Sequence, residues 1–253
     1  HLGLIAEDSS GDTRAYNTAT LNTALEGMHR NGNVTLAHGG VGPLMRPISF
    51  TAKNFHFNAP IITPTRLGGG LIGSPSWGPI GTNSQFQSGS SVGGLRTRLT
   101  FTGNNSQGYA AIRVRGGGFV IENLDIMASA AGDNDIPTSC IEIEARANPE
   151  TNYNIIRNCS LTGSVAGIEA SYTFLNDSNE FEVAEGGGAH GVVDNVSFTN
   201  LDYFFVSGNA NARHWHFNNI VGSETTAKET TVFKLTRGGA ITANGVKLGI
   251  SKA

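Results

Sequence analysis

Two glutamates occupy equivalent positions in two similar segments of the chain. Glu142 is the third residue of Cys140–Glu144, and Glu169 is the third residue of Gly167–Ser171. If these segments are neighbouring strands in register, the two side chains lie about one strand spacing, ~4.8 Å, apart. Retaining glycosidases use two carboxyl groups ~5 Å apart, and inverting ones use groups ~6.5–9.5 Å apart. The spacing permits hydrolysis of a polysaccharide, with Glu142 and Glu169 as candidate acid and base.

The same charges also allow a structural interpretation. The preceding segment, Ala111–Arg115, places Arg113 level with Glu142 and Arg115 level with Glu144. Exposed ion pairs of this kind contribute under ~1 kcal/mol each. The sequence therefore leaves both interpretations open, and Arg113 is in addition a candidate contact for a glycan or a partner.

Five similar segments between residues 111 and 248 would position these side chains. Each has a short alternating strand, a turn, a second strand that ends at or near an asparagine, and a third strand. The asparagines are Asn123, Asn158, Asn195, Asn219 and Asn244, in steps of 35, 37, 24 and 25 residues. Such spacing predicts a solenoid with insertions at fixed corners. Asparagine tolerates left-handed backbone, so we interpret these residues as a structural ladder.

Alternation along the first strands predicts which side chains face the core. One inward column is Ile112, Ile141, Ile168, Phe204 and Phe233, and a second is Val114, Ile143, Ala170, Val206 and Leu235. The outward column is Arg113, Glu142, Glu169, Phe205 and Lys234. Outward aromatics are candidate contacts for a glycan or a partner, because exposed apolar patches mark interaction sites. These candidates are Tyr203, Phe205 and Trp215, together with Trp77 in a long loop.

The first 40 residues differ from the repeats. Leu21, Ala24, Leu25 and Met28 recur at helical spacing and predict a helix over 16–30, after a polar turn at 11–13. A strand is predicted at 34–37. We expect residues 1–40 to form a cap and residues 41–253 to form the stack, with long loops at 63–96 and 172–190. Together they are predicted to make one elongated domain.

The order of these elements resembles the pectate-lyase-like superfamily. Many of its polysaccharide-degrading enzymes and phage tailspikes begin with a Gly-Asp turn, a capping helix, a strand and a Gly-rich corner. Here the matching residues are Gly11-Asp12, 17–30, Val34–Leu36 and Gly39-Gly40. The resemblance covers nearly the whole chain and rests on architecture. It implies an all-β fold, a right-handed parallel β-helix (solenoid) with an N-terminal capping α-helix.

The catalytic motifs of that superfamily's enzymes are missing. Of the polygalacturonase motifs only a partial Gly-His-Gly appears, at Ala189–Gly191, and of the pectate lyase base motif only Arg46-Pro47 appears. Their absence favours a non-catalytic structural or adhesive module that resembles phage spike or virion-decorating β-helices. The resemblance then implies an extracellular or virion-surface location, a homotrimer or larger assembly, and polysaccharide as a candidate contact. The alternative is a polysaccharide lyase or glycoside hydrolase of the superfamily.

Composition narrows the partners further. Charged residues make up 15% of the chain and the formal net charge is -3, without a basic stripe, so no nucleic-acid partner is expected. No apolar run approaches the ~20 residues of a membrane span. The chain starts at His1 rather than Met, and we therefore expect a processed form or a fragment.

Metal and cofactor signals are weak, and we expect no cofactor. Asp133 and Asp135 offer oxygen ligands of the kind calcium takes, without the full loop pattern. His214 and His216 flank Trp215 as an i, i+2 pair, which is two ligands short of a structural zinc site, so a surface pair is the simpler interpretation.

The two cysteines are predicted to be separate thiols. By the strand alternation Cys159 points into the core, whereas Cys140 takes an outward or corner position. A disulfide requires the two side chains to point toward each other, which these positions do not provide.

Overall fold

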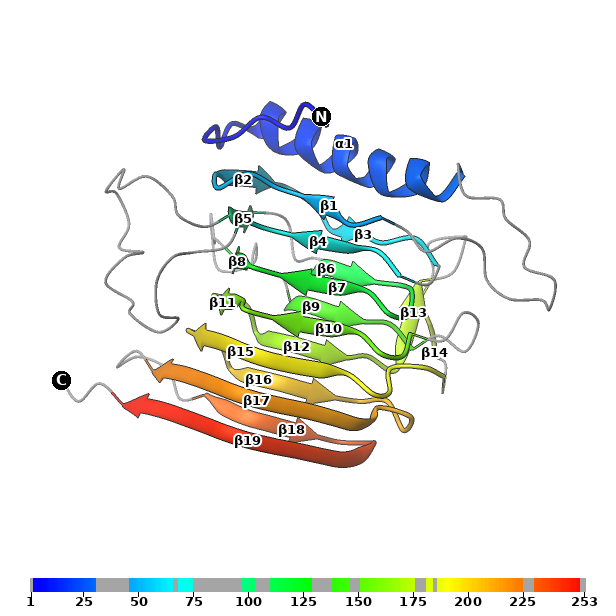
Figure 1. The fold of residues 1–253 in the computed structure, drawn as a ribbon, viewed down its shortest axis with the longest axis vertical. Coiled ribbons are helices and arrows are strands. Elements are labelled where there is room, and N and C mark those ends of the chain that lie inside the picture. The colour runs from blue at the N-terminus through cyan, green and yellow to red at the C-terminus, as the bar shows by residue number, and fades with distance from the viewer. Residues whose placement is uncertain are drawn as a thin grey trace.

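The computed structural model describes residues 2–30, 46–65, 68–74, 97–102, 110–128, 138–145, 151–175, 181–183, 186–224 and 230–250. One helix, α1 (Gly11–Arg30), lies across one end of a stack of short strands (Figure 1). The strands of the two larger sheets pair in parallel, each with its counterpart one repeat further along the chain. The protein is therefore mostly β, and its curled parallel sheets are consistent with a parallel β-helix or a similar solenoid.

The larger sheet contains eleven strands and the second sheet six. The larger one runs β1 (Ile48–Ser49), β4 (Gly70–Ile72), β7 (Val120–Glu122), β10 (Ile155–Arg157), β15 (Val192–Thr199), β11 (Ser160–Thr162), β8 (Leu124–Ala128), β5 (Thr97–Phe101) and β2 (Asn54–Phe57). From β15 it continues to β17 (Arg213–Glu224) and β19 (Gly239–Ile250). The second runs β18 (Thr231–Leu235), β16 (Tyr203–Ser207), β12 (Ala166–Ala170), β9 (Ser139–Ile143), β6 (Ala110–Val114) and β3 (Ile61–Ile62).

Two segments predicted as long loops contain strands. Strand β4 lies within the segment 63–96 and pairs with β1 and β7. Within 172–190, β13 (Thr173–Leu175) and β14 (Phe181–Val183) form a separate antiparallel pair. Both were missed because glycine, serine and acidic residues dominate these segments and mask short apolar runs. The predicted strand at 34–37 lies outside the described residues.

Helix α1 begins at Gly11, five residues before the predicted start at residue 16. The Ser10 hydroxyl accepts a hydrogen bond from the Thr13 amide at 3.3 Å, as an N-cap does, and Asp8 in turn binds Ser10 and Thr13. The polar turn was thus part of the helix and its cap. Leu21 and Leu25 are buried against the strands, as the helical spacing predicted.

Polar side chains of α1 also close the edge of the first repeat. The Asn17 side chain donates to the Ile5 and His56 carbonyls at 2.8 and 3.2 Å, and Asn22 bridges the Pro60 carbonyl and the Ile62 amide. An open strand edge would leave these backbone groups without protein partners. The helix therefore caps the stack by hydrogen bonding as well as by apolar packing.

The bend between the second and third strands is left-handed in successive repeats. Asn123, Asn158, Asn195 and Asn219 have φ values of 57°, 53°, 55° and 52°. The expectation was wrong for Asn244, because Asn244 pairs with Asn218 and the bend falls on Gly245, whose φ is 67°. Asn195 donates to the Asn158 side-chain oxygen at 2.9 Å, so neighbouring bends are also joined by side chains.

Strand β16 lies one residue away from its predicted register. Ile168 pairs with Phe205, and Glu169 pairs with Val206. The alignment of the repeats had predicted Phe204 as the partner of Ile168 and Phe205 as the partner of Glu169. Because side-chain directions alternate along a strand, this shift turns Phe205 inward and Val206 outward. Phe205 is fully buried, as is Phe204, which stacks on Phe198 with ring centroids 4.7 Å apart.

Cys140 is also buried, contrary to the prediction of an outward or corner position. It stands beside Ile141 at the start of β9, where the chain enters from a corner and two consecutive side chains join the core, as Ala111 and Ile112 do in β6. Its thiol lies 3.1 Å from the Ser164 hydroxyl, and burial raises the pKa of Cys140 to about 11. Cys140 and Cys159 are free thiols, as predicted.

Gly191 tests the packing between repeats. A Cβ atom at this position would overlap the ring of Trp215, which is itself buried. We expect Gly191→Ala to lower the free energy of unfolding by about 1–3 kcal/mol, because a packed core has no room to shift the indole.

The matched control is Gly239→Ala, since nothing lies within 4 Å of the Cβ position there. Urea unfolding of both variants measures the difference. Equal stabilities for the two variants would contradict the contact between Gly191 and Trp215.

Candidate functional site

A column of charged residues crosses the second sheet on its outward side. Arg113 on β6, Glu142 on β9 and Glu169 on β12 are register partners, in the order that the sequence predicted. Together with Glu144 they form what we call the charged strip. The next two members of the column are Val206 and Lys234, because of the shifted register of β16.

Ion pairs join the members of the charged strip. The Arg113 Nε atom lies 2.9 Å from Glu142 Oε2 and 3.6 Å from Glu144 Oε1, and Arg115 Nε lies 3.5 Å from the other Glu144 oxygen. The pairing of Arg113 with Glu142 and of Arg115 with Glu144 matches the structural interpretation of the sequence.

Three of the strip's four members are buried and Glu169 is half-buried, which overturns the expectation of an exposed face. Arg113 is 3% exposed, Glu142 6% and Glu144 0%. Strand alternation reports the side from which a side chain leaves the sheet, but it does not report whether other parts of the chain cover that side. Arg113 therefore does not offer its guanidinium to a glycan or a partner in this structure.

Burial makes the two candidate acid–base residues unequal. The pKa of Glu169 is raised to about 7 by burial and by the neighbouring charge of Glu142, with Arg113 acting in the opposite direction. The pKa of Glu142 is also raised, chiefly by burial, while its ion pair with Arg113 opposes the rise. Glu169 therefore holds a proton near neutral pH, whereas Glu142 is paired with a cation. In enzymes, two carboxyl groups in such different environments act as acid and base.

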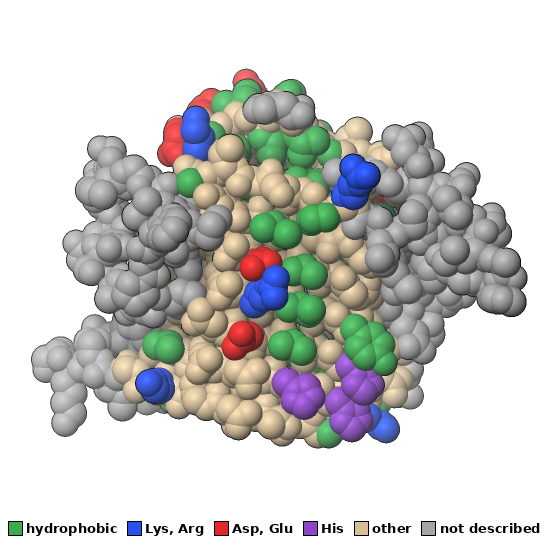
Figure 2. Space-filling model, in the orientation of Figure 1, with side chains coloured by type: hydrophobic (Ala, Val, Ile, Leu, Met, Phe, Trp, Pro, Cys, Tyr) green, Lys and Arg blue, Asp and Glu red, His purple; other side chains and the backbone are tan. Residues whose placement is uncertain are grey.

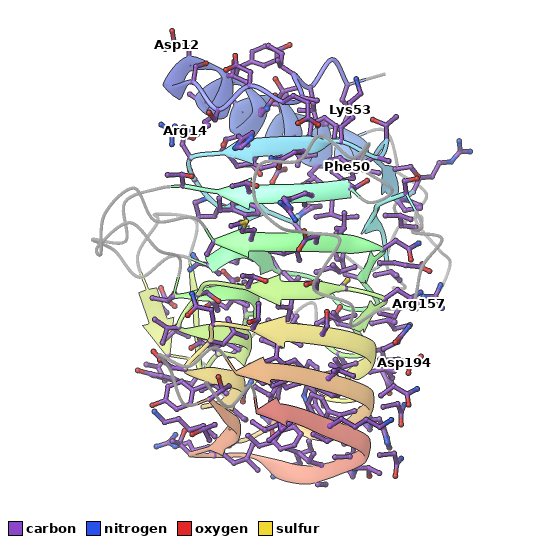
Figure 3. The ribbon with its side chains drawn as sticks, turned by 90° about the vertical axis from the view of Figure 1, so that its left-hand side faces the viewer. Asp12, Arg14, Phe50, Lys53, Arg157 and Asp194 are labelled. Atoms are coloured by element: carbon purple, nitrogen blue, oxygen red, sulfur yellow. The ribbon has the colours of Figure 1, made fainter. Side chains whose placement is uncertain are left out.

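Other ion pairs in the stack have the same construction. Arg98 and Asp125 are register partners with Nε and Oδ2 2.6 Å apart, and Glu122 and Arg157 are register partners 2.8 Å apart. Asp194 follows Arg157 in the next repeat, and the two project from the same side of the stack in Figure 3. Alternating charges between repeats are thus a general device of this fold and do not by themselves mark a catalytic site.

Three aromatic side chains stack at one corner of the repeats. Tyr153, His190 and His214 have ring centroids 5.0 Å apart at each step, with interplanar angles of 9° and 11°. All three have positive φ and are exposed, and histidines gather at the lower part of the face in Figure 2. We call this column the corner stack. Its preceding and following positions are Gly118 and Ala240, both also with positive φ.

The sequence analysis missed the corner stack, although a signal was present. Each of its residues stands two positions before a register-matched residue of the larger sheet, namely Ile155, Val192 and His216. His214 and His216 are both exposed, but His214 packs against His190 at the corner. Within the described part of the chain, no group of three or more His, Cys, Asp or Glu residues is placed to hold a metal ion.

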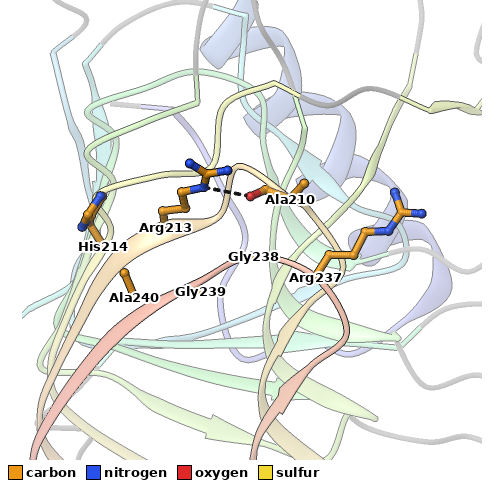
Figure 4. A pocket seen from close by; sticks show the side chains of 7 residues that line it. All are labelled: Ala210, Arg213, His214, Arg237, Gly238, Gly239 and Ala240. Atoms are coloured by element: carbon orange, nitrogen blue, oxygen red, sulfur yellow. Dashed lines mark hydrogen bonds between the residues drawn. The ribbon is translucent and has the colours of Figure 1, made fainter.

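A hollow of about 650 Å³ adjoins the end of the corner stack (Figure 4). Two segments border it, 210–214 and 237–240, each of which runs from a connection into the start of a strand, β17 and β19 respectively. The exposed side chains of Arg213, His214 and Arg237 line the hollow with the small residue Ala240. Arg213 donates from Nε to the Ala210 carbonyl at 3.2 Å, which orients its guanidinium.

The predicted aromatic contacts occupy different places. Phe205 and Trp215 were expected to point outward, but both lie in the core, with their rings 5.0 Å apart. The Trp215 indole donates to the Gly188 carbonyl at 2.8 Å, so its polar atom is satisfied inside. Tyr203 is half-buried, with the Lys234 ammonium 4.3 Å from its ring centroid. Trp77, Asp133 and Asp135 lie outside the described residues.

Comparisons with known proteins add no relative. No family model matches the chain, and no curated protein matches it. Among the described residues, no helix combines the length and the apolar character needed to cross a membrane. Functional inference therefore rests on the geometry of the charged strip and the corner stack.

The raised pKa of Glu169 predicts how stability depends on pH. Because the folded state holds this proton more tightly than the unfolded state, stability is greatest below the unfolded pKa and falls as pH rises toward about 7. We expect Glu169→Gln to remove this loss. When the pH is raised from 5 to 8, the free energy of unfolding of the variant should increase by on the order of 2 kcal/mol relative to that of the parent protein.

Urea unfolding at the two pH values measures this difference. Glu26→Gln, on the exposed surface of α1, removes a carboxylate far from the strip and should leave the pH dependence unchanged. Parallel pH profiles for the parent and Glu169→Gln would show that Glu169 is not buried beside Glu142.

Proposed function

We propose that the chain is a non-catalytic structural or adhesive module, built as a right-handed parallel β-helix of the virion spike or virion-decorating kind. The observation that carries this proposal is the burial of three members of the charged strip. Arg113, Glu142 and Glu144 engage one another across neighbouring strands, and their exposed fractions are at most 6%. Carboxylates held in this way join repeats and are not presented to a substrate.

The energetic context supports the same role. Removing one partner of a buried ion pair leaves an uncompensated charge, at a cost of roughly 3–5 kcal/mol. Arg113 therefore matters for the folded stack whether or not the surrounding surface binds anything. Ion pairs at Arg98 and Arg157 repeat the device on the other sheet.

Exposed apolar and aromatic groups supply surfaces for assembly and adhesion. Leu235 and Leu248, on the last strands of the two sheets, are 47% and 46% exposed, and Tyr153 is 63% exposed. Burial of such side chains between chains would stabilise an assembly, since apolar surface is favourably removed from water. We propose a homotrimer or larger assembly, located outside the cell or on a virion surface, that contacts polysaccharide and needs no cofactor.

A second candidate function is hydrolysis or lysis of a polysaccharide. The observation that favours it is the unequal pair: Glu169, with its pKa raised to about 7, is the register partner of Glu142. In this case Glu169 would donate a proton to the leaving group and Glu142 would act as base or nucleophile. Substrate would first have to reach side chains that are largely buried.

The mass of the native particle tests the structural proposal. Light scattering at micromolar concentration should give about three times the 26.5 kDa of one chain, or a larger assembly. Addition of a chelator should leave this mass unchanged, since no metal is required. A particle of one chain at all concentrations would contradict the proposed assembly.

A polysaccharide panel separates the two candidate functions. The structural module should release no new reducing ends or unsaturated products from any member of the panel. Activity that is lost in both Glu142→Gln and Glu169→Gln, but retained in Arg157→Gln at a remote ion pair, would overturn the non-catalytic proposal.

A further inference from the structure

The corner stack ends one ring short of the last repeat. Rings of Tyr153, His190 and His214 follow one another at 5.0 Å, the spacing that neighbouring strands impose. The next position is Ala240, which has the same left-handed backbone, with φ of 57° against 58° at His214. A methyl group replaces a ring there, so no ring of the described residues stacks on the outer face of His214 at this position.

Two positive charges line the hollow next to this face. Figure 4 shows His214 above Ala240, with Arg213 next to His214 and Arg237 on the opposite side of the hollow. The bond from Arg213 Nε to the Ala210 carbonyl uses one of the five guanidinium donors and holds the side chain at the border of the hollow. Gly238 and Gly239 keep the border of the hollow low, because they carry no side chains.

We propose that the hollow binds a sugar ring that bears an anionic substituent, either a carboxylate or a sulfate. The ring would continue the corner stack by laying its C–H face on the imidazole of His214. The anionic group would accept charge-assisted hydrogen bonds from the guanidinium of Arg213 or Arg237, the geometry for which arginine is suited. Two guanidinium groups in the lining of one hollow favour an anionic sugar over a neutral one.

This inference rests on the proposed adhesive function and specifies its ligand class. The site differs from the charged strip in every residue. It also lies on the larger sheet's side of the repeats, where the chain enters β17 and β19. Binding there requires no catalytic group and no change in the fold.

Three probes distinguish the ligand chemistries: a hyaluronan tetrasaccharide for carboxylate, a κ-carrageenan tetrasaccharide for sulfate, and fully N-acetylated chitotetraose as a neutral sugar. Isothermal titration calorimetry of the full chain should detect at least one acidic probe and give at least tenfold weaker binding of chitotetraose. In a nuclear magnetic resonance titration, the ring signals of His214 should shift and reach their end point at the same probe concentration as the heat signal.

Two variants localise the binding. Arg213→Gln removes a charge, and Ala240→Tyr fills the slot with a ring in a backbone conformation that Tyr153 already adopts. Each should weaken the acidic probe at least tenfold. Lys247→Gln, an equal loss of charge at an exposed position on β19, should leave binding within twofold.

Binding of all three probes with equal affinity, or full affinity in Ala240→Tyr, would overturn the inference. Failure of every probe would overturn it as well, while leaving the assembly measured by light scattering intact. If the particle is a single chain and still binds an acidic probe through Arg213, the proposed assembly is contradicted and the sugar site is supported. The two proposals can therefore fail separately.

Discussion

The register of parallel strand pairing is the constraint on which the rest of this structure depends. Each strand meets its counterpart from the next repeat, so residues at one position of successive repeats form a column along the stack. An apolar column becomes the core, and a column of left-handed residues becomes a bend or a corner. A column of alternating charge becomes a row of ion pairs. A shift of one residue exchanges the inner and outer columns of a strand.

The charged strip illustrates how a column can serve the fold and resemble an active site at once. Arg113 neutralises Glu142 and Glu144, whereas Glu169 lies one repeat further and relies on a proton near neutral pH. The same features, a raised pKa and two neighbouring carboxyl groups, are those that acid–base catalysis uses. Accessibility separates the two cases, and here burial favours the structural role. The corner stack, by contrast, is exposed and presents side chains to solvent.

Much of the fold could be predicted from the sequence, because alternation and the recurring asparagines report local geometry directly. The errors fall where this information is absent. Residues 203–206 read Tyr-Phe-Phe-Val. Because all four are aromatic or apolar, they do not alternate and do not indicate the register, and Phe205 was wrongly predicted to point outward. Burial of Glu142 depends on what covers the sheet, which alternation does not report. The corner stack was missed because its residues differ in type and are united only by position in the repeat.

Thiol accessibility at two adjacent positions of β16 tests the register most directly. In the structure Val206 points outward, and Ser207 points inward and is 1% exposed. The alignment of the repeats predicts the reverse. Both native cysteines are buried, so they should stay silent toward a thiol reagent under native conditions. We expect Val206→Cys to be labelled without unfolding and Ser207→Cys to be labelled only after denaturation. Rapid labelling of Ser207→Cys with protection of Val206→Cys would contradict the register and return Phe205 to the surface.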